Sequence, residues 1–273
     1  MQNFKTIVLL VTISGLLLAI GFAIGGVAGV IIALILAMTM NIGSFWFSAD
    51  VVLKSSRARE IAYADDSDLF RMIESVAREA EMPMPRVYIM DTPQPNAFAT
   101  GRSPNHAAVA VTTGIRKLLT DRELRGVLGH EMAHVANRDI LTSSIVATVA
   151  SAISFISFFA FWFGGRRGGW ALLIAAIVAP IAATVIQLAI SRSREYQADS
   201  DGARFVQDPK ALASALAKLE QGAQQIPREV PEATAHLYIV NPLAGRSFSR
   251  LFSTHPPLEQ RIERLHQMSG YPK

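Results

Sequence analysis

Two long apolar stretches constrain the fold of this chain more than any other feature of its sequence. The first runs from Thr6 to Ala49 without a charged side chain, about twice the roughly 20 residues that one membrane-spanning helix needs. Three glycines within residues 25–29 interrupt it, so we expect a tight turn there and a transmembrane hairpin over residues 1–52. A cleaved signal peptide is the alternative, but the apolar run is too long for one and lacks a clear cleavage site followed by polar sequence.

The second apolar stretch covers residues 140–190 and is divided by the glycines and arginines of segment 164–169. Each half is long enough to span the hydrocarbon core of a bilayer. Aromatic residues typical of a membrane interface lie near the division: Phe158, Phe159, Trp162 and Trp170. Serines make the first half less apolar, so this hairpin could instead lie partly against the protein. The chain, 51% hydrophobic, is therefore expected to be a mainly α membrane protein with four hydrophobic helices in two hairpins.

Positive charges flank these stretches unevenly. The ends that would share one side of the membrane carry Lys5, Lys54, Arg57, Arg59, Arg138, Arg192 and Arg194. The opposite side has Arg166 and Arg167, and lysine and arginine are enriched in cytoplasmic loops. We therefore expect both termini and the polar segments in the cytoplasm. The net charge is +4, but no basic patch with interleaved aromatic residues is present, so we expect no nucleic-acid partner.

The polar residues form two segments, 59–139 and 191–273, which together have about the size of one domain. Apolar periodicity and turn residues predict an α+β domain with a small sheet, whose two halves are separated by the second hairpin. Strands are expected at Arg86–Met90, Ala97–Thr100 and Ala107–Thr112. Helices are expected to be capped at Ser67 or Asp68 and at Asp121, and to cover Pro209–Gln221 and Pro257–Met268.

The helix expected after Asp121 carries the pattern H-E-x-x-H at residues 130–134. His130 and His134 are four residues apart, so they share one helix face and can bind one metal ion. Glu131 can then reach a water on that metal, which is the arrangement of zinc proteases, with the glutamate as general base. The alternative is two ordinary histidines on an amphipathic helix. Gly126 and Gly129 lower the helix propensity, but they would allow close packing.

A catalytic zinc usually has three protein ligands, and the chain has no cysteine, so the third ligand must be His, Asp or Glu. The best candidate is Glu195, and Asp199, four residues further on, would share its helix face. One can bind the metal while the other accepts an N–H from a ligand histidine; the alternative is a solvated acidic face. Asp139 could orient His134, but we favour the interpretation that it marks the water boundary.

These motifs, taken together, resemble those of the HtpX family of bacterial membrane zinc metalloproteases. That family is related to the CAAX prenyl protease and belongs to the gluzincins, whose third zinc ligand is a glutamate. The segments 96–101, 109–114 and 253–257 also resemble family motifs, and the resemblance covers nearly the whole chain. It implies a zincin-like catalytic domain and one Zn²⁺ per chain, held by His130, His134 and Glu195.

The same resemblance implies roles for further residues. With Glu195 as the ligand, Asp199 is left to support a ligand histidine. His255 would lie near the site and supply a hydrogen-bond donor to the reaction; the alternative is a polar residue that caps the last helix ahead of two prolines. The segment Asn96, Ala97, Phe98, Ala99 and Thr100 would be the edge strand on which a substrate is laid; the alternative is a core strand with Phe98 buried.

We therefore expect a membrane-anchored zinc endopeptidase that cleaves misfolded or damaged membrane proteins at the cytoplasmic face of the bacterial inner membrane. The bilayer and protein or peptide substrates are its expected partners, and the sequence does not indicate an oligomeric state. An intramembrane protease is the first alternative, but the charges of residues 121–125 would cost several kcal/mol in lipid. A non-enzymatic scaffold with a structural metal is the second, but structural zinc sites favour four ligands with cysteine, and Glu131 would have no purpose there.

Overall fold

The computed structural model describes residues 2–141, 192–225, 239 and 256–269. The first part contains α1 (Gln2–Ser55), β1 (Arg59–Glu60), α2 (Ser67–Glu79), β2 (Arg86–Met90), β3 (Ala97–Gly101), the 3₁₀ turn η1 (Pro104–His106), β4 (Ala107–Thr112), α3 (Thr113–Leu118) and α4 (Asp121–Ala136). The second part contains α7 (Arg192–Val206), α8 (Pro209–Gln225) and α9 (Leu258–Ser269).

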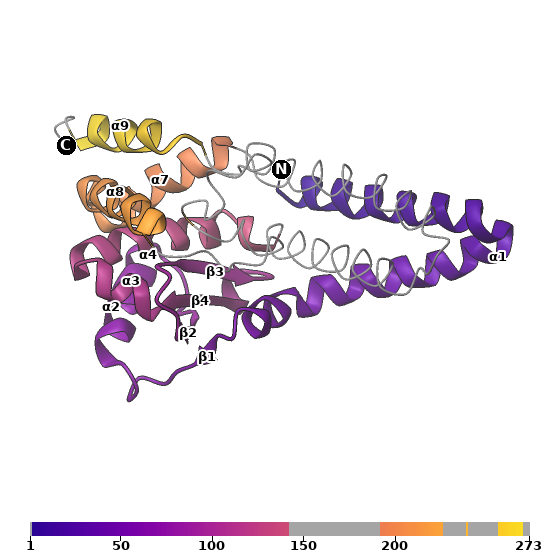
Figure 1. Ribbon diagram of the computed structural model, residues 1–273, viewed down its shortest axis with the longest axis horizontal. Coiled ribbons are helices and arrows are strands. Elements are labelled where there is room, and N and C mark those ends of the chain that lie inside the picture. Colours follow the sequence, from indigo (N-terminus) through magenta and orange to yellow (C-terminus); the bar gives the residue numbers. More distant parts are fainter. Residues whose placement is uncertain (1, 142–191, 226–238, 240–255, 270–273) are drawn as a thin grey trace.

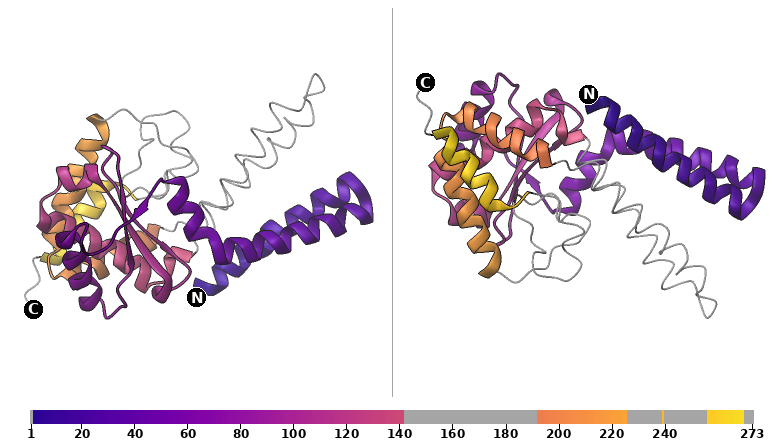
Figure 2. Two further views of the ribbon diagram at one scale, coloured as in Figure 1. Left: turned by 90° about the horizontal axis from the view of Figure 1, so that it is seen from below. Right: turned by 90° about the horizontal axis from the view of Figure 1, so that it is seen from above.

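Helix α1 turns back on itself and extends away from the sheet and the helices that are labelled with it (Figures 1 and 2). Gly26 has a φ of +56°, a backbone conformation that glycine adopts readily, and it lies within the expected turn at residues 25–29. Within the described residues, we found no helix that combines the length and apolar character of a membrane span. The first transmembrane hairpin therefore stays a prediction, and residues 142–190 of the second lie outside the described residues.

The sheet has the strand order β1-β2-β4-β3, with β2 parallel to β4 and the other pairs antiparallel. β2 and β4 have the expected bounds, and β3 extends one residue further, to Gly101. Alternate residues of the strands face opposite sides. Val87, Val109 and Val111 face the main core with α2 and α4, whereas Tyr88 and Phe98 pack with the end of α1. β1 was not expected, because two residues carry no periodicity.

Both expected helix caps were wrong by one or two residues. Thr120, and not Asp121, caps α4: its hydroxyl accepts the N–H of Glu123, and the Glu123 carboxylate accepts the N–H of Thr120. This reciprocal pair is a capping box. Asp66, and not Ser67 or Asp68, caps α2 by accepting the N–H of Leu69.

The remaining helices form layers above the sheet (Figure 1). α4 contacts β3, α7 and α8 contact α4, and α9 packs on α7 and α8. Apolar residues of α8 and α9, such as Leu212, Leu216 and Leu265, complete the main core. α4 is therefore buried between the sheet and α7, which places its histidines in the interior of the domain.

Candidate metal centre

His130 and His134 lie on the face of α4 that meets α7. His130 is only 1% exposed, and His134 is half-buried. Their ring centroids are 4.7 Å apart and the rings are nearly perpendicular. The four-residue spacing therefore brings both imidazoles to one place, as a helical repeat requires.

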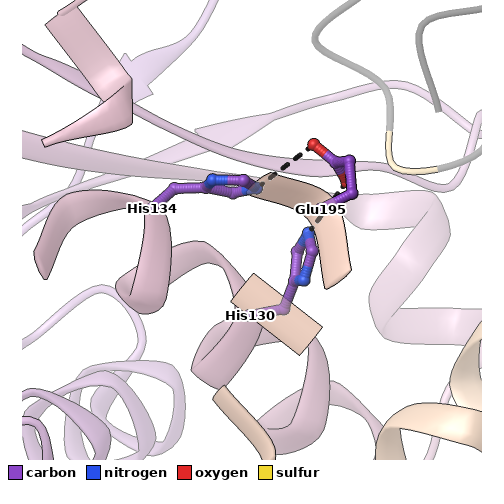
Figure 3. A group of neighbouring side chains, drawn as sticks. All are labelled: His130, His134 and Glu195. Atoms are coloured by element: carbon purple, nitrogen blue, oxygen red, sulfur yellow. Dashed lines mark ion pairs between the residues drawn. The ribbon is translucent and has the colours of Figure 1, made fainter. Parts of the chain in front are cut away.

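Glu195, on the first turn of α7, lies between the two rings (Figure 3). Its Oε2 is 3.7 Å from Nε2 of His130, and its Oε1 is 3.6 Å from Nε2 of His134. A tetrahedral zinc with bonds of about 2.0–2.1 Å would separate its ligand atoms by roughly 3.4 Å. The three side chains offer ligand atoms that all lie within 4.8 Å of one another, so the structure brings the three expected ligands together at a spacing that suits one ion.

Two glycines allow α7 to lie this close to α4. A Cβ on Gly202 of α7 would be 2.5 Å from the backbone nitrogen of His130, and a Cβ on Gly129 of α4 would be 2.8 Å from the backbone oxygen of Gly202. No side chain fits at those distances. Gly126 makes a similar approach to α8, where a Cβ would lie 2.8 Å from the Leu212 nitrogen. The glycines of α4 thus permit the close packing that the sequence indicated.

The other ring nitrogens of both histidines face aspartates. Nδ1 of His130 is 3.0 Å from Oδ1 of Asp199, and Nδ1 of His134 is 3.2 Å from Oδ2 of Asp139. A proton on each Nδ1 leaves each Nε2 free to bind a metal. Asp199 therefore lies where the resemblance implied. Our interpretation of Asp139 as a marker of the water boundary was wrong, because it is 3% exposed and contacts His134.

Each aspartate in turn contacts a buried arginine that the sequence did not reveal. Arg261 of α9 donates two hydrogen bonds to Asp199, of 2.7 and 2.8 Å. Arg194 of α7 donates one to Asp139, of 3.2 Å. The sequence does contain one sign that Arg261 is buried. It occupies the apolar stripe of its helix, three residues after Leu258 and four before Leu265.

The electrostatics of the site favour a cation. Burial alone would lower the pKa of His134, but the hydrogen bond to Asp139 and the charge of Glu195 raise it to about 9. In the absence of a metal, the carboxylates therefore retain a proton on the imidazole. A divalent cation bound by the three ligands would satisfy the same negative charge.

Glu131 lies beside this triad on α4 and is 5% exposed. Its Oε2 accepts a hydrogen bond of 2.9 Å from the backbone N–H of Ala99 in β3. Burial raises the pKa of Glu131, although His130, His134 and the Ala99 N–H oppose that rise. A carboxylate whose pKa is raised towards neutrality is a stronger proton acceptor than an exposed one.

The segment from Asn96 to Thr100 forms the last strand of the described sheet and part of its core. The backbone oxygen of Asn96 accepts a bond from Thr112 of β4, whereas the N–H of Ala99 points away from β4 towards Glu131. Phe98 is 4% exposed. The structure agrees with the interpretation of a core strand with Phe98 buried, and the role of the segment as a substrate edge stays a prediction. His255 lies outside the described residues, so its expected place near the site is not seen.

Three comparisons relate the chain to known proteins. A model of the family described as Peptidase family M48 matches residues 63–269. The chain is 50% identical to the "Protease HtpX homolog" of Syntrophobacter fumaroxidans over 280 residues, which cover 98% of this chain and 99% of the relative. It is 51% identical to the "Protease HtpX homolog" of Aquifex aeolicus over 270 residues, covering 94% and 89%. The crystal structure of S. mikatae Ste24p has a TM-score of 0.52 at 18% identity, covering 96% of this chain and 65% of that chain, which is a likeness of fold.

Proposed function

Since this chain belongs to peptidase family M48 and is a metalloprotease, we propose that it is a zinc-dependent endopeptidase anchored in the bacterial cytoplasmic membrane. Its proposed substrates are misfolded or damaged membrane proteins, cleaved at the cytoplasmic face. The observation that carries the proposal is the triad of His130, His134 and Glu195 with the buried Glu131 beside it.

The donor set suits zinc. Two imidazole nitrogens and one carboxylate oxygen are ligands that zinc accepts, and three protein ligands leave one position open, as in catalytic rather than structural sites. When bound there, zinc would lower the pKa of a water towards about 7 and polarise the scissile carbonyl. The absence of cysteine from the chain argues against a closed structural site.

We assign the proton transfers to Glu131. Its carboxylate would take a proton from the attacking water and deliver it to the leaving amine. The hydrogen bond from Ala99 fixes one carboxylate oxygen at 2.9 Å, which orients the side chain while the other oxygen stays available. Burial raises the pKa of Glu131, so its protonated form is easier to reach during the reaction than that of an exposed glutamate.

We assign substrate binding to β3, the last strand of the described sheet, although its five residues are buried. An extended peptide can add to a sheet edge through backbone hydrogen bonds, which depend little on side-chain sequence. Because the outward N–H of Ala99 already contacts Glu131, a peptide along β3 would pass beside the general base. Recognition through the backbone suits unfolded segments of many sequences, which is what a quality-control protease must accept.

The surface of α1 supports contact with a bilayer. All but two of the exposed large apolar side chains in the described part of the chain lie on α1, and the two are Tyr63 and Met84. A continuous apolar surface of this kind is unusual on a monomeric soluble protein. By contrast, α4 carries exposed ion pairs, Arg122 with Asp208 and Arg125 with Glu79. Such charges would be costly in lipid, which supports a catalytic site outside the bilayer over an intramembrane one.

The test compares wild-type protein with Glu131→Gln in detergent, measuring zinc content and cleavage of an unfolded protein such as casein. The wild type should hold one zinc per chain and cleave, whereas Glu131→Gln should hold the same zinc and lose cleavage by at least about 100-fold, the lower range for a general base. Cleavage by Glu131→Gln at the wild-type rate would overturn the assigned role, and a wild type that binds no zinc would overturn the cofactor.

A further inference from the structure

We propose that Arg261 of the C-terminal helix α9 is a positioning residue of the metal centre, which acts through Asp199 to hold His130 in its zinc-binding orientation. This inference rests on the proposed zinc site and adds a residue outside both motifs. It also makes α9 a part of the metal centre, although α9 lies more than 60 residues along the chain from Glu195, the one proposed metal ligand on α7.

Arg261 is an unusual side chain for a helix surface. It is 0% exposed and is among the largest fully buried side chains of the chain. Its Nε donates to Oδ2 of Asp199 at 2.8 Å, and its Nη2 donates to Oδ1 of Asp199 at 2.7 Å. This two-point contact fixes the plane of the carboxylate, since guanidinium and carboxylate match each other as planar forks.

The fixed carboxylate then contacts the metal ligand. Oδ1 of Asp199, which accepts the Nη2 bond, is 3.0 Å from Nδ1 of His130. A carboxylate at that nitrogen selects the tautomer with the proton on Nδ1 and leaves Nε2 for the metal. Rotation of Asp199 would break this arrangement, and Arg261 is the group that prevents the rotation.

The charge of Arg261 also matters. Four buried carboxylates surround the site, those of Glu131, Glu195, Asp199 and Asp139, and Nη1 of Arg261 is 3.8 Å from Oε2 of Glu195. A divalent ion together with the guanidinium groups of Arg261 and Arg194 balances these four negative charges.

A purely structural role for Arg261 makes a different prediction. α9 also packs through Leu258, Ile262 and Leu265, so its docking does not depend on the arginine alone. If Arg261 acts through Asp199, then replacing Arg261 should weaken zinc binding only in a protein that keeps the aspartate at position 199. If it merely stabilises the domain, its effect should not depend on the residue at position 199.

The experiment measures zinc affinity by chelator competition in full-length, detergent-purified protein carrying Glu131→Gln, which prevents self-cleavage. Asp199→Asn should weaken zinc binding about 10- to 100-fold, the range for partners of ligand histidines. Arg261→Gln should weaken it about tenfold, and adding Arg261→Gln to Asp199→Asn should weaken it no further. Arg264→Gln, which removes an exposed arginine of the same helix, should leave the affinity unchanged.

Equal losses from Arg261→Gln in both backgrounds, or no loss in either, would overturn the proposal. If Arg261→Gln does not fold, the experiment uses Arg261→Lys instead. The lysine keeps the charge but lacks the planar fork, so an unchanged zinc affinity of the Arg261→Lys variant would also overturn the proposal. The comparison requires that the protein carrying Glu131→Gln alone binds zinc. If this protein binds none, the proposed cofactor is refuted. If it binds zinc and the Arg261 variants bind zinc equally well, only the role of Arg261 is refuted.

Discussion

The backbone nitrogen of His130 faces Gly202 so closely that a Cβ on Gly202 would lie 2.5 Å from it. This contact joins the two helices that carry the proposed zinc ligands. The position of Glu195 relative to His130 and His134 therefore depends on Gly202, a residue that supplies no ligand atom, so it can be tested without changing the ligands themselves.

We expect Gly202→Ala to push α7 away from α4, because the new Cβ would meet backbone atoms of Gly129 and His130, which cannot rotate aside. Overpacking of this kind costs about 1–3 kcal/mol, so thermal unfolding should occur at a lower temperature, and zinc affinity should fall as Glu195 moves. Gly222→Ala is the matched control, since its Cβ would meet side-chain atoms alone: the flexible end of Leu118 at 2.9 Å, and Cγ of Pro95 at an ordinary contact distance of 3.5 Å. Equal unfolding temperatures and equal zinc affinities of the two variants would show that the zinc site does not need this close approach of α7 to α4.

The contact between Asp139 and His134 predicts a second loss of zinc affinity. Asp139→Asn cannot hold the proton on Nδ1 of His134 as an ionised carboxylate does, so zinc affinity should fall about 10- to 100-fold. Chelator competition measures it, and Asp201→Asn, which removes a carboxylate that contacts Asn137 and Arg204 instead, should have no effect. An unchanged affinity for Asp139→Asn would restore its interpretation as a boundary residue.

Glu123 predicts how stability depends on pH. Burial alone would raise its pKa, but hydrogen bonds from Lys218, Ser214 and Thr120 lower it to about 2 from 4.5. The folded state thus has the lower pKa, so the carboxylate stabilises the protein above about pH 4.5 and loses this effect as the pH falls towards 2. Because Lys218 is partly exposed and solvent screens its charge, we expect the ionised Glu123 carboxylate to contribute about 2 kcal/mol to the free energy of unfolding.

Glu123→Gln should therefore melt at a lower temperature than the wild type at pH 7, and the difference should narrow at pH 4. Thermal unfolding in detergent at both pH values measures it, with Glu74→Gln, an exposed residue of α2, as the control. A difference that stays constant or grows as the pH falls would contradict the assigned hydrogen bonds.

The parts that the sequence predicted well are local ones. The spacing of His130 and His134 follows from one helical turn, and that of Glu195 and Asp199 from another. The strands at Arg86–Met90 and Ala107–Thr112 are short runs rich in apolar residues next to turn residues, and the structure has them at the same bounds. Here the local pattern and the packed structure agree.

The parts that it missed depend on contacts between distant segments. Arg261 and Asp199 are 62 residues apart, and Arg194 and Asp139 are 55 apart, so no spacing rule connects them. Asp139 borders an apolar stretch, which favours a boundary residue, although in the folded protein it is buried and contacts Arg194 of α7. Only the arginine on the apolar stripe of α9 gave a local sign of its buried partner.

The central claim is that one divalent ion is bound between α4 and α7. Diffraction from zinc-loaded crystals at the zinc absorption edge tests it most directly, because anomalous scattering locates the metal. We predict a single zinc within bonding distance, about 2.0–2.2 Å, of Nε2 of His130, Nε2 of His134 and a carboxylate oxygen of Glu195. A zinc bound elsewhere, or one bound to the histidines while Glu195 points away, would contradict this account.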